Sequence, residues 1–297
     1  MRISADCIPC LMKRVLFQSR LDGRSDDYAS TEAALKELAR CISPEKSSAE
    51  VAAAVHAAAY SRLTTDDPYR KLKVEADRIA DSLAGRAQEY VNSSGDRIKA
   101  AFEVSVAGNI MDFGSSGEVI DDPSEFEPVF GELLEQGLGV YDENVINPLI
   151  LGAKNIVYMF DNCGESQLDR ILIRELRSRG KHVTGIVRGR SILNDVTAED
   201  AVRSGLDTDL DSMVTTGKFY IGMDWKDIPE ETRNAVAASD VIIAKGMANY
   251  EAVSDETVPI PIIHAFRVKC GPVSDSCGIP VGTNAVFAVL NGRRMEE

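Results

Sequence analysis

Residues 156–165 read Ile-Val-Tyr-Met-Phe-Asp-Asn-Cys-Gly-Glu. The first five form a short, continuous apolar run with β-branched residues, which is typical of a buried β-strand. Directly after it, apolar residues recur at helical spacing from Leu168 to Leu176, so we expect a helix over residues 164–179. A buried strand that leads straight into a helix indicates a parallel sheet whose faces are covered by helices.

The same alternation continues toward the C-terminus. The segments with strand character are residues 183–187, 241–244 and 260–266, and those with helical character are residues 197–204 and 230–238. Strands that alternate with helices predict an α/β fold with a mostly parallel sheet covered on both faces.

The first hundred residues carry helical patterns only. Cys7, Leu11 and Val15 share one helical face. Further along, Ser47 and Glu50 have the spacing of a capping box ahead of an apolar run. These signals predict a bundle or cap of helices at the N-terminal end.

A helix start is also expected at Asp67-Pro68, an N-cap residue followed by proline. We therefore expect an α-helical region over residues 1–105 and an α/β domain that carries the site over residues 106–297. Residues 113–144 contain many acidic residues and several glycines, and they are the expected linker or lid.

Composition limits the classes of partner. The 297 residues are 44% hydrophobic and 27% charged, with a formal net charge of −14. This charge argues against a nucleic-acid partner, because phosphate backbones require a basic face. No apolar run approaches the roughly 20 residues that span a bilayer, and no signal peptide opens the sequence, so a cytoplasmic location without a membrane partner is expected. The oligomeric state is not readable from the sequence.

Six cysteines occur, and in a cytoplasmic chain they are not expected to form a disulfide framework. Cys7-x-x-Cys10 is the only close pair. Two interpretations carry equal weight. The pair is either two thiols on the first turn of a helix, or half of a second metal or redox site that Cys270 and Cys277 complete.

Polar residues follow three of the expected strands. Asp161 and Asn162 follow the first, Asp195 lies beyond the second, and Lys245 ends the third. Because ligands bind at the carboxyl ends of strands in open parallel sheets, we expect these side chains to meet at one edge of the sheet. Carboxylate and amide oxygens suit hard or borderline divalent cations.

Other residues at this edge favour an anionic ligand. Gly164 begins a helix directly after the first strand, so its backbone N–H groups could meet an anion. Lys245 could neutralise a phosphoryl oxygen. The three histidines lack metal-ligand spacing, which excludes a zinc-hydrolase site of the HExxH type.

Each of these residues also has a purely structural interpretation. Asp161-Asn162 and Asp195 could cap the helices that follow them, and Lys245 could be a surface lysine in a turn. Their joint placement at three strand ends favours a functional site. The aspartyl nucleophile of haloacid-dehalogenase-type phosphatases is a weaker match, because Cys163 stands where those enzymes carry a second acid.

Several short motifs together resemble those of the damage-control phosphatase family, long classified as a domain of unknown function. The Cys-x-x-Cys pair is typical of its compact microbial branch. The resemblance covers nearly the whole chain, in the family's order. The matching motifs are Cys7-x-x-Cys10, Asp67-Pro68-Tyr69, Gly108-Asn109-x-x-Asp112, Phe160-Asp161-Asn162-Cys163-Gly164-Glu165, Asn194-Asp195-Val196-Thr197 and Lys245-Gly246-x-x-Asn249-Tyr250.

The resemblance implies a Rossmann-like α/β/α sandwich with an α-helical N-terminal region. It further implies one divalent metal ion, Mg²⁺, Mn²⁺, Co²⁺ or Ni²⁺, held by Asp161, Asn162 and Asp195. The expected substrates are small phosphorylated metabolites, such as sugar phosphates, phosphopantetheine-like compounds or damaged phosphometabolites.

The same resemblance assigns the substrate-binding residues. They are Asn109, Asp112, Gly164, Glu165, Lys245, Asn249 and Tyr250. The expected catalytic residues are Asp161, Asp195 and Lys245. The nucleophile is either a water molecule, which we favour, or a carboxylate.

Two other functions stay open. A eukaryotic relative of the family has been described as a carboxyl methyltransferase that uses S-adenosylmethionine, although the first strand here ends without a glycine-rich loop. The third interpretation is a non-enzymatic metabolite-binding protein.

Overall fold

The computed structural model describes residues 1–24, 26–116 and 119–296. In these residues an eight-stranded sheet forms the centre of the fold. Seven of its strands lie in the order β1-β7-β6-β5-β2-β3-β4, and the eighth, β8, pairs with β7. The strands are β1 (Val140–Tyr141), β2 (Asn155–Met159), β3 (His182–Val187), β4 (Ser212–Thr215), β5 (Val241–Lys245), β6 (Ile262–Arg267), β7 (Asn284–Leu290) and β8 (Arg293–Arg294).

The sheet is mostly parallel, as the sequence predicts. From β6 through β5, β2 and β3 to β4 every neighbouring pair is parallel. β7 runs antiparallel to β6. The chain proceeds from β2 to β3 and β4 on one side and then crosses to β5 on the other side of β2. The carboxyl ends of β2 and β5 therefore flank the topological switch point, where α/β sheets bind ligands.

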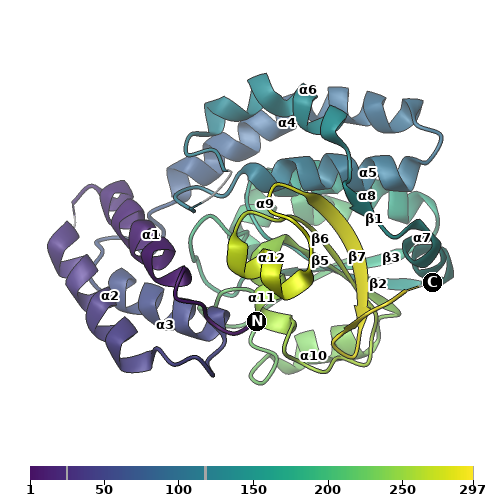
Figure 1. Cartoon of the computed structure of the whole chain (residues 1–297). Helices are drawn as coiled ribbons and strands as arrows, with labels where there is room; N and C mark the ends of the chain where they lie inside the picture. The colour runs from purple at the N-terminus through teal and green to yellow at the C-terminus, as the bar shows by residue number, and fades with distance from the viewer. Residues whose placement is uncertain (25, 117–118, 297) are drawn as a thin grey trace.

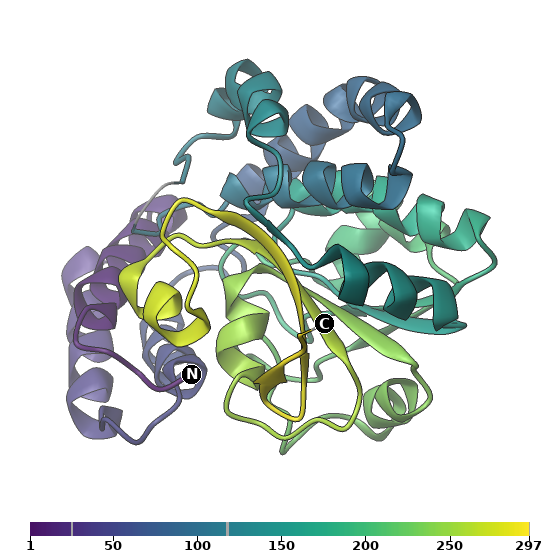
Figure 2. The ribbon, with the colours of Figure 1, turned by 45° about the vertical axis from the view of Figure 1, so that its right-hand side comes forward.

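Helices cover both faces of the sheet (Figures 1 and 2). Alternate residues of β2 divide between two apolar cores: Ile156 and Tyr158 face one, and Val157 and Met159 face the other. The helices are α1 (Cys7–Asp22), α2 (Asp27–Cys41), α3 (Ser48–Tyr60), α4 (Arg70–Ser93), α5 (Arg97–Ala107), α6 (Phe126–Gln136), α7 (Glu143–Gly152), α8 (Glu165–Ser178), α9 (Ala198–Ser204), α10 (Glu230–Ala237), α11 (Gly246–Val253) and α12 (Gly271–Cys277).

In the described part of the first 107 residues, α1 to α5 are joined by turns and loops, and α1 to α3 lie beside the sheet in Figure 1. α4 and α5 stack on α8, and residues of α1 to α5 and α8 belong to one apolar core. The division at residues 105 and 106 stays a prediction. None of the helices in the described ranges combines the length and apolar character needed to cross a membrane.

Two expected helix starts differ in detail. Ser47 precedes α3 as predicted, but its side chain makes no cap hydrogen bond and Glu50 pairs with Lys46 instead, so the capping box is wrong. α4 begins at Arg70 rather than at Pro68. The carboxylate of Asp67 lies 3.4 Å from the buried Lys73 Nζ, where it neutralises a charge rather than capping a helix.

The expected linker or lid over residues 113–144 is wrong for its central part. Phe126 and Phe130 of α6 are fully buried, and α6 packs on α4 and α5. The helical spacing of its apolar residues, rather than its acidic composition, decides the structure of this segment. Residues 117–118 lie outside the described ranges.

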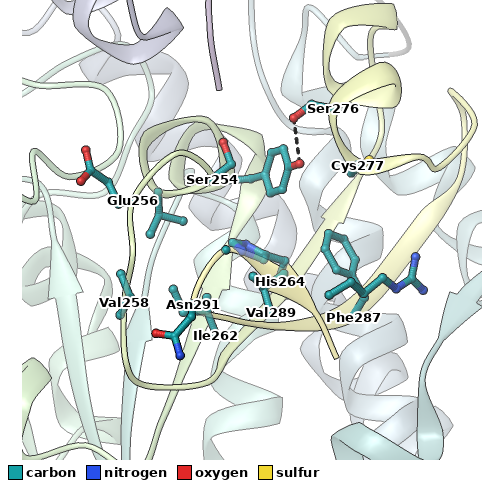
Figure 3. A pocket seen from close by; sticks show the side chains of 14 residues that line it. Ser254, Glu256, Val258, Ile262, His264, Ser276, Cys277, Phe287, Val289 and Asn291 are labelled. Atoms are coloured by element: carbon teal, nitrogen blue, oxygen red, sulfur yellow. Dashed lines mark hydrogen bonds between the residues drawn. The ribbon is translucent and has the colours of Figure 1, made fainter. Parts of the chain in front are cut away.

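A buried histidine makes the fold sensitive to acid. His264 on β6 is 1% exposed, and its ring centroid lies 5.1 Å from that of Tyr250 and 5.4 Å from that of Phe287 (Figure 3). Within the described ranges its Nδ1 has no hydrogen-bond partner. Burial lowers the pKa of His264 to about 3.

The folded protein should therefore lose stability as the pH falls. Above the unfolded-state pKa of about 6.5 the contribution of His264 is fully present, and it declines toward pH 3 because only the unfolded chain takes up the proton. The expected loss from pH 7 to pH 5 is about 2 kcal/mol for this residue. Urea unfolding at both pH values should show a smaller loss for His264→Phe than for wild type. Equal losses would contradict the assignment.

Candidate functional site

The end of β2 and the loop after β3 meet at one place. Asn162 and Asp195 face each other in an isolated antiparallel bridge. Backbone hydrogen bonds fix this contact: Val196 N donates to Asp161 O at 2.8 Å and Cys163 N donates to Asn194 O at 2.9 Å. Asp161, Asn162 and Asp195 are 5%, 2% and 3% exposed. The three predicted metal ligands thus form one buried cluster, although Asp195 lies more than 30 positions after Asp161 and Asn162 in the chain.

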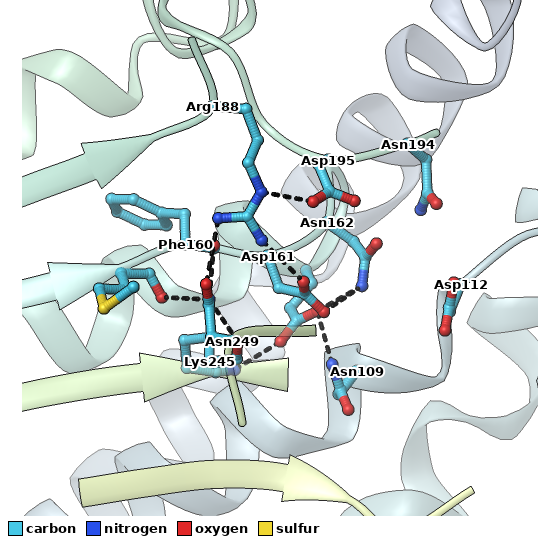
Figure 4. A network of polar contacts seen from close by, with 12 residues as sticks. Asn109, Asp112, Phe160, Asp161, Asn162, Arg188, Asn194, Asp195, Lys245 and Asn249 are labelled. Carbon is cyan, nitrogen blue, oxygen red and sulfur yellow. Dashed lines mark hydrogen bonds and ion pairs between the residues drawn. The ribbon is translucent and has the colours of Figure 1, made fainter. Parts of the chain in front are cut away.

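Arg188, at the end of β3, lies between the two carboxylates (Figure 4). Its Nε is 2.5 Å from Asp195 Oδ2, and its Nη2 is 3.3 Å from Asp161 Oδ1. Its Nη1 donates to Asn249 Oδ1 at 3.1 Å. Sequence analysis predicts no role for this arginine, although a charged residue directly after a buried strand is a signal for one.

The amide of Asn162 is held in one orientation. Its Nδ2 donates to Asp161 Oδ2 at 2.9 Å and to Glu165 Oε2 at 3.1 Å. Carboxylates only accept hydrogen bonds, so the amide oxygen is the atom of Asn162 that can serve a cation.

The electrostatics of the cluster favour a cation. Burial and the negative charges of Asp195 and Glu165 raise the pKa of Asp161 well above its usual range. Burial also raises the pKa of Asp195, although Arg188 opposes the shift. A divalent ion would supply the positive charge that these carboxylates lack. Two carboxylates and an amide oxygen fit a hard or borderline divalent metal.

Gly246 makes room for this cluster at the start of α11. Its φ is +72°, and a Cβ at this position would lie 1.8 Å from Asp161 Oδ2. Glycine is therefore required both by the backbone conformation and by the adjacent carboxylate.

Gly246→Ala should lower kcat for the predicted phosphate-ester hydrolysis by about 100-fold or more, because displacement of Asp161, a predicted catalytic carboxylate, by an ångström would have an effect of that size. Gly278→Ala is the matched control: its φ is +71°, but no atom lies within 4 Å of the added Cβ. Steady-state kinetics measure the loss of kcat, and urea unfolding measures the loss of stability that an alanine at a positive φ causes in both variants. Equal kcat values for the two variants would contradict the collision with Asp161.

Lys245 is fully buried and does not line the cavity described below. Its Nζ is 2.6 Å from Glu165 Oε1 and 3.0 Å from Asp169 Oδ1, and it donates to Ser105 O at 3.0 Å. Burial opposes protonation, but the two carboxylates more than compensate and raise the pKa of Lys245. A direct contact between Lys245 and the substrate stays a prediction. The protein contacts of Lys245 favour an indirect role, in which it holds Glu165 and Glu165 in turn holds Asn162.

Asn109 and Asn249 are also fully buried. Asn109 Nδ2 donates to Glu165 Oε2 at 2.9 Å, which joins it to the same network. Asn249 Nδ2 donates to Lys245 O at 2.7 Å and to the carbonyl oxygen of Phe160 at 3.0 Å. Asn249 therefore ties the ends of β2 and β5 together, and its predicted substrate contact stays untested.

Gly164 and Tyr250 have protein partners. The N–H of Gly164 donates to Asp77 Oδ1 of α4 at 2.6 Å, so a protein carboxylate takes the place expected for a substrate anion. Tyr250 OH lies 2.9 Å from Ser276 Oγ, and Tyr250 lines a separate cavity of about 110 Å³. Substrate contacts of both residues stay predictions without a supporting contact.

A cavity of about 300 Å³ opens beside the carboxylate cluster. Asp161, Asn162 and Asp195 line it together with Asp112. Asp112 accepts hydrogen bonds from Lys269 Nζ at 3.0 Å and from Arg14 Nη2. Burial raises the pKa of Asp112, but Arg14 and Lys269 outweigh it and hold the pKa below its usual value.

Three cysteines line the same cavity. They are Cys7 and Cys10 at the start of α1 and Cys270 just before α12, whereas Cys277 lines the smaller cavity. Burial raises the pKa of Cys7 and brings that of Cys270 to about 11, which makes these thiols poor nucleophiles. Within the described ranges, no three His, Cys, Asp or Glu side chains are arranged to hold a metal ion. The second metal or redox site stays a prediction.

Comparisons with known proteins agree over nearly the full length. A family model described as the damage-control phosphatase ARMT1-like domain matches residues 3–285. A protein of Archaeoglobus fulgidus named damage-control phosphatase is 36% identical over 284 residues, which are 95% of this chain and 97% of the relative. A damage-control phosphatase of Pyrococcus horikoshii is 26% identical over 289 residues, which are 95% of this chain and 96% of the relative.

The fold comparison gives the same result. A crystal structure of a DUF89 family protein from Pyrococcus horikoshii matches with a TM-score of 0.83 at 25% identity. The match covers 99% of this chain and 100% of the other. The predicted α/β/α sandwich is confirmed.

Proposed function

The chain belongs to the family of the damage-control phosphatase ARMT1-like domain, and we propose that it is a divalent-metal-dependent phosphatase acting on small phosphorylated metabolites. One observation carries the proposal. The buried Asp161, Asn162 and Asp195 converge at the wall of a cavity of about 300 Å³, a size suited to a small ligand.

These three residues would hold the metal ion, which is Mg²⁺, Mn²⁺, Co²⁺ or Ni²⁺, since oxygen ligands discriminate little among them. When bound, the ion supplies Lewis-acid chemistry at a phosphoryl oxygen. Arg188 keeps Asp161 and Asp195 at a fixed separation, and Glu165 accepts a hydrogen bond from the amide nitrogen of Asn162, which would leave the amide oxygen to bind the ion.

The overall reaction consumes water and a phosphate monoester and releases an alcohol and inorganic phosphate. Water remains our proposed nucleophile. Asp112 is a poor candidate for its general base, because two cations hold its pKa low. Asp195 is the remaining candidate, since it lines the cavity beside Asp161 and Asn162.

Sugar phosphates, phosphopantetheine-like compounds and damaged phosphometabolites are the proposed substrate classes. The names of the relatives from Archaeoglobus fulgidus and Pyrococcus horikoshii support phosphatase activity, and they specify no substrate.

The test is hydrolysis of p-nitrophenyl phosphate by metal-stripped protein before and after addition of Mg²⁺, Mn²⁺, Co²⁺ or Ni²⁺. We expect activity only after metal addition. Absence of activity with every metal and with a panel of metabolite phosphates would reject the proposal, and binding of S-adenosylmethionine would then be measured.

A further inference from the structure

Arg14 brings a positive charge into the cavity that contains Asp161 and Asp195. It lies on α1, one helical turn after Cys10. Among the described residues that line the cavity, it is the single Lys or Arg, whereas five are acidic: Asp6, Asp112, Asp161, Asp195 and Glu251. The lining residue His56 adds no charge at neutral pH, because burial lowers its pKa to about 3.

The charges around Arg14 divide the cavity into two sides. Arg14 and Lys269 share Asp112, so this trio carries one net positive charge. Asp161 and Asp195 share Arg188, so that trio carries one net negative charge when both carboxyls are ionised. A cation is favoured on the second side and an anion on the first.

The guanidinium of Arg14 has hydrogen-bonding capacity left over. Arginine carries five N–H donors. Nη2 donates to Asp112 Oδ1, but Nε is buried without a hydrogen-bond partner within the described ranges. A buried donor is normally paired, so an unpaired one at a cavity wall indicates a ligand atom. The side chain is 16% exposed.

α1 is fixed against the loop that carries Asp112, so Arg14 is held in place. Lys13 Nζ donates to Ser115 O at 2.7 Å. The contact is close: a Cβ on Gly114 would lie 2.5 Å from the ring of Phe17. A side chain held this way binds with little loss of conformational entropy.

We propose that Arg14 binds the phosphoryl group of the substrate, with Asp112 as the residue that positions its guanidinium. This inference rests on the proposed phosphatase function and adds to it a substrate-binding residue from the N-terminal helical region. The planar guanidinium matches the oxygens of a phosphate monoester dianion better than an ammonium group does.

The test compares Arg14→Met with Arg20→Met, a control on the same helix whose side chain is 68% exposed. Isothermal titration of the Mn²⁺-loaded protein with inorganic phosphate measures binding without turnover. We expect the dissociation constant to rise about tenfold or more for Arg14→Met and to stay unchanged for Arg20→Met. The dissociation constant of Arg14→Lys for phosphate should lie between those of the wild type and Arg14→Met. Unchanged phosphate binding in Arg14→Met would overturn the inference.

A second measurement uses the wild-type chain, so it does not depend on folding of a variant. Phenylglyoxal modifies arginine side chains, and mass spectrometry locates the adducts. Inorganic phosphate should slow modification of Arg14 at least about fivefold and leave Arg20 unaffected. Equal modification of Arg14 with and without phosphate would overturn the inference. Failure of the wild type to hydrolyse any phosphate ester would reject the proposed function, whereas protection of Arg14 would still establish an anion site.

Discussion

Asp161→Asn is expected to lower kcat for aryl phosphate hydrolysis by at least about 1,000-fold, because loss of one preorganised charged group at a transition state has effects of this size. The substitution keeps the shape of the side chain and removes one of the two carboxylates beside Arg188. Metal binding should be lost together with turnover.

The metal-free variant should nevertheless remain stable. Burial and neighbouring negative charges raise the pKa of Asp161, so a neutral amide at this position relieves repulsion. Thermal unfolding with and without 1 mM Mn²⁺ should therefore show a metal-induced rise of Tm in wild type and none in Asp161→Asn.

Asp227→Asn is the control, since that side chain is 78% exposed and pairs with Lys218, and neither residue lines the cavity. Its kcat and metal-induced Tm shift should equal those of wild type. If Asp161→Asn turned over within tenfold of wild type, Asp161 would not hold an essential metal ion.

Lys245→Met should lower the free energy of unfolding by about 3–5 kcal/mol, because removal of one partner leaves buried charges uncompensated. Glu165 and Asp169, both fully buried, would share a site without the lysine. Urea unfolding at pH 7 measures this loss.

Two further variants make the result specific. Lys226→Met removes a lysine whose side chain is 80% exposed and should change stability by less than about 0.5 kcal/mol. The double variant Lys245→Met/Glu165→Gln should recover part of the lost stability, since one of the two buried charges is gone. If Lys245→Met were as stable as wild type and only its KM were raised, Lys245 would instead contact the substrate.

The sequence predicts the parallel part of the sheet, because its strands are short apolar runs followed by helices. Sequence analysis predicts neither β4 nor β7. β4 has four residues, of which only Val214 is buried, so it carries little apolar signal. β7 contains a continuous apolar run over residues 285–290, which was an available signal, but its antiparallel pairing with β6 depends on contacts distant in the sequence.

The candidate site, like the sheet, is predictable from the sequence only in part. Asp161, Asn162 and Asp195 follow neighbouring parallel strands, so the rule of strand carboxyl ends predicts their proximity. The direction of a long side chain is not predictable in this way. Lys245 turns toward α8, where Glu165 and Asp169 face the sheet.

Arg14 reaches the site only through docking of α1 on residues 112–116. Arg14 lies one helical turn after Cys10, so both residues are on one helical face. This spacing is the local sequence feature that could have indicated a role for Arg14 at the site.

The most direct test of the metal site is anomalous X-ray scattering at the manganese edge, from crystals grown with Mn²⁺ and inorganic phosphate. We predict one strong peak among the oxygens of Asp161, Asn162 and Asp195, with the phosphate between this peak and Arg14. No peak at these residues, or a peak only at Cys7, Cys10 and Cys270, would contradict the account.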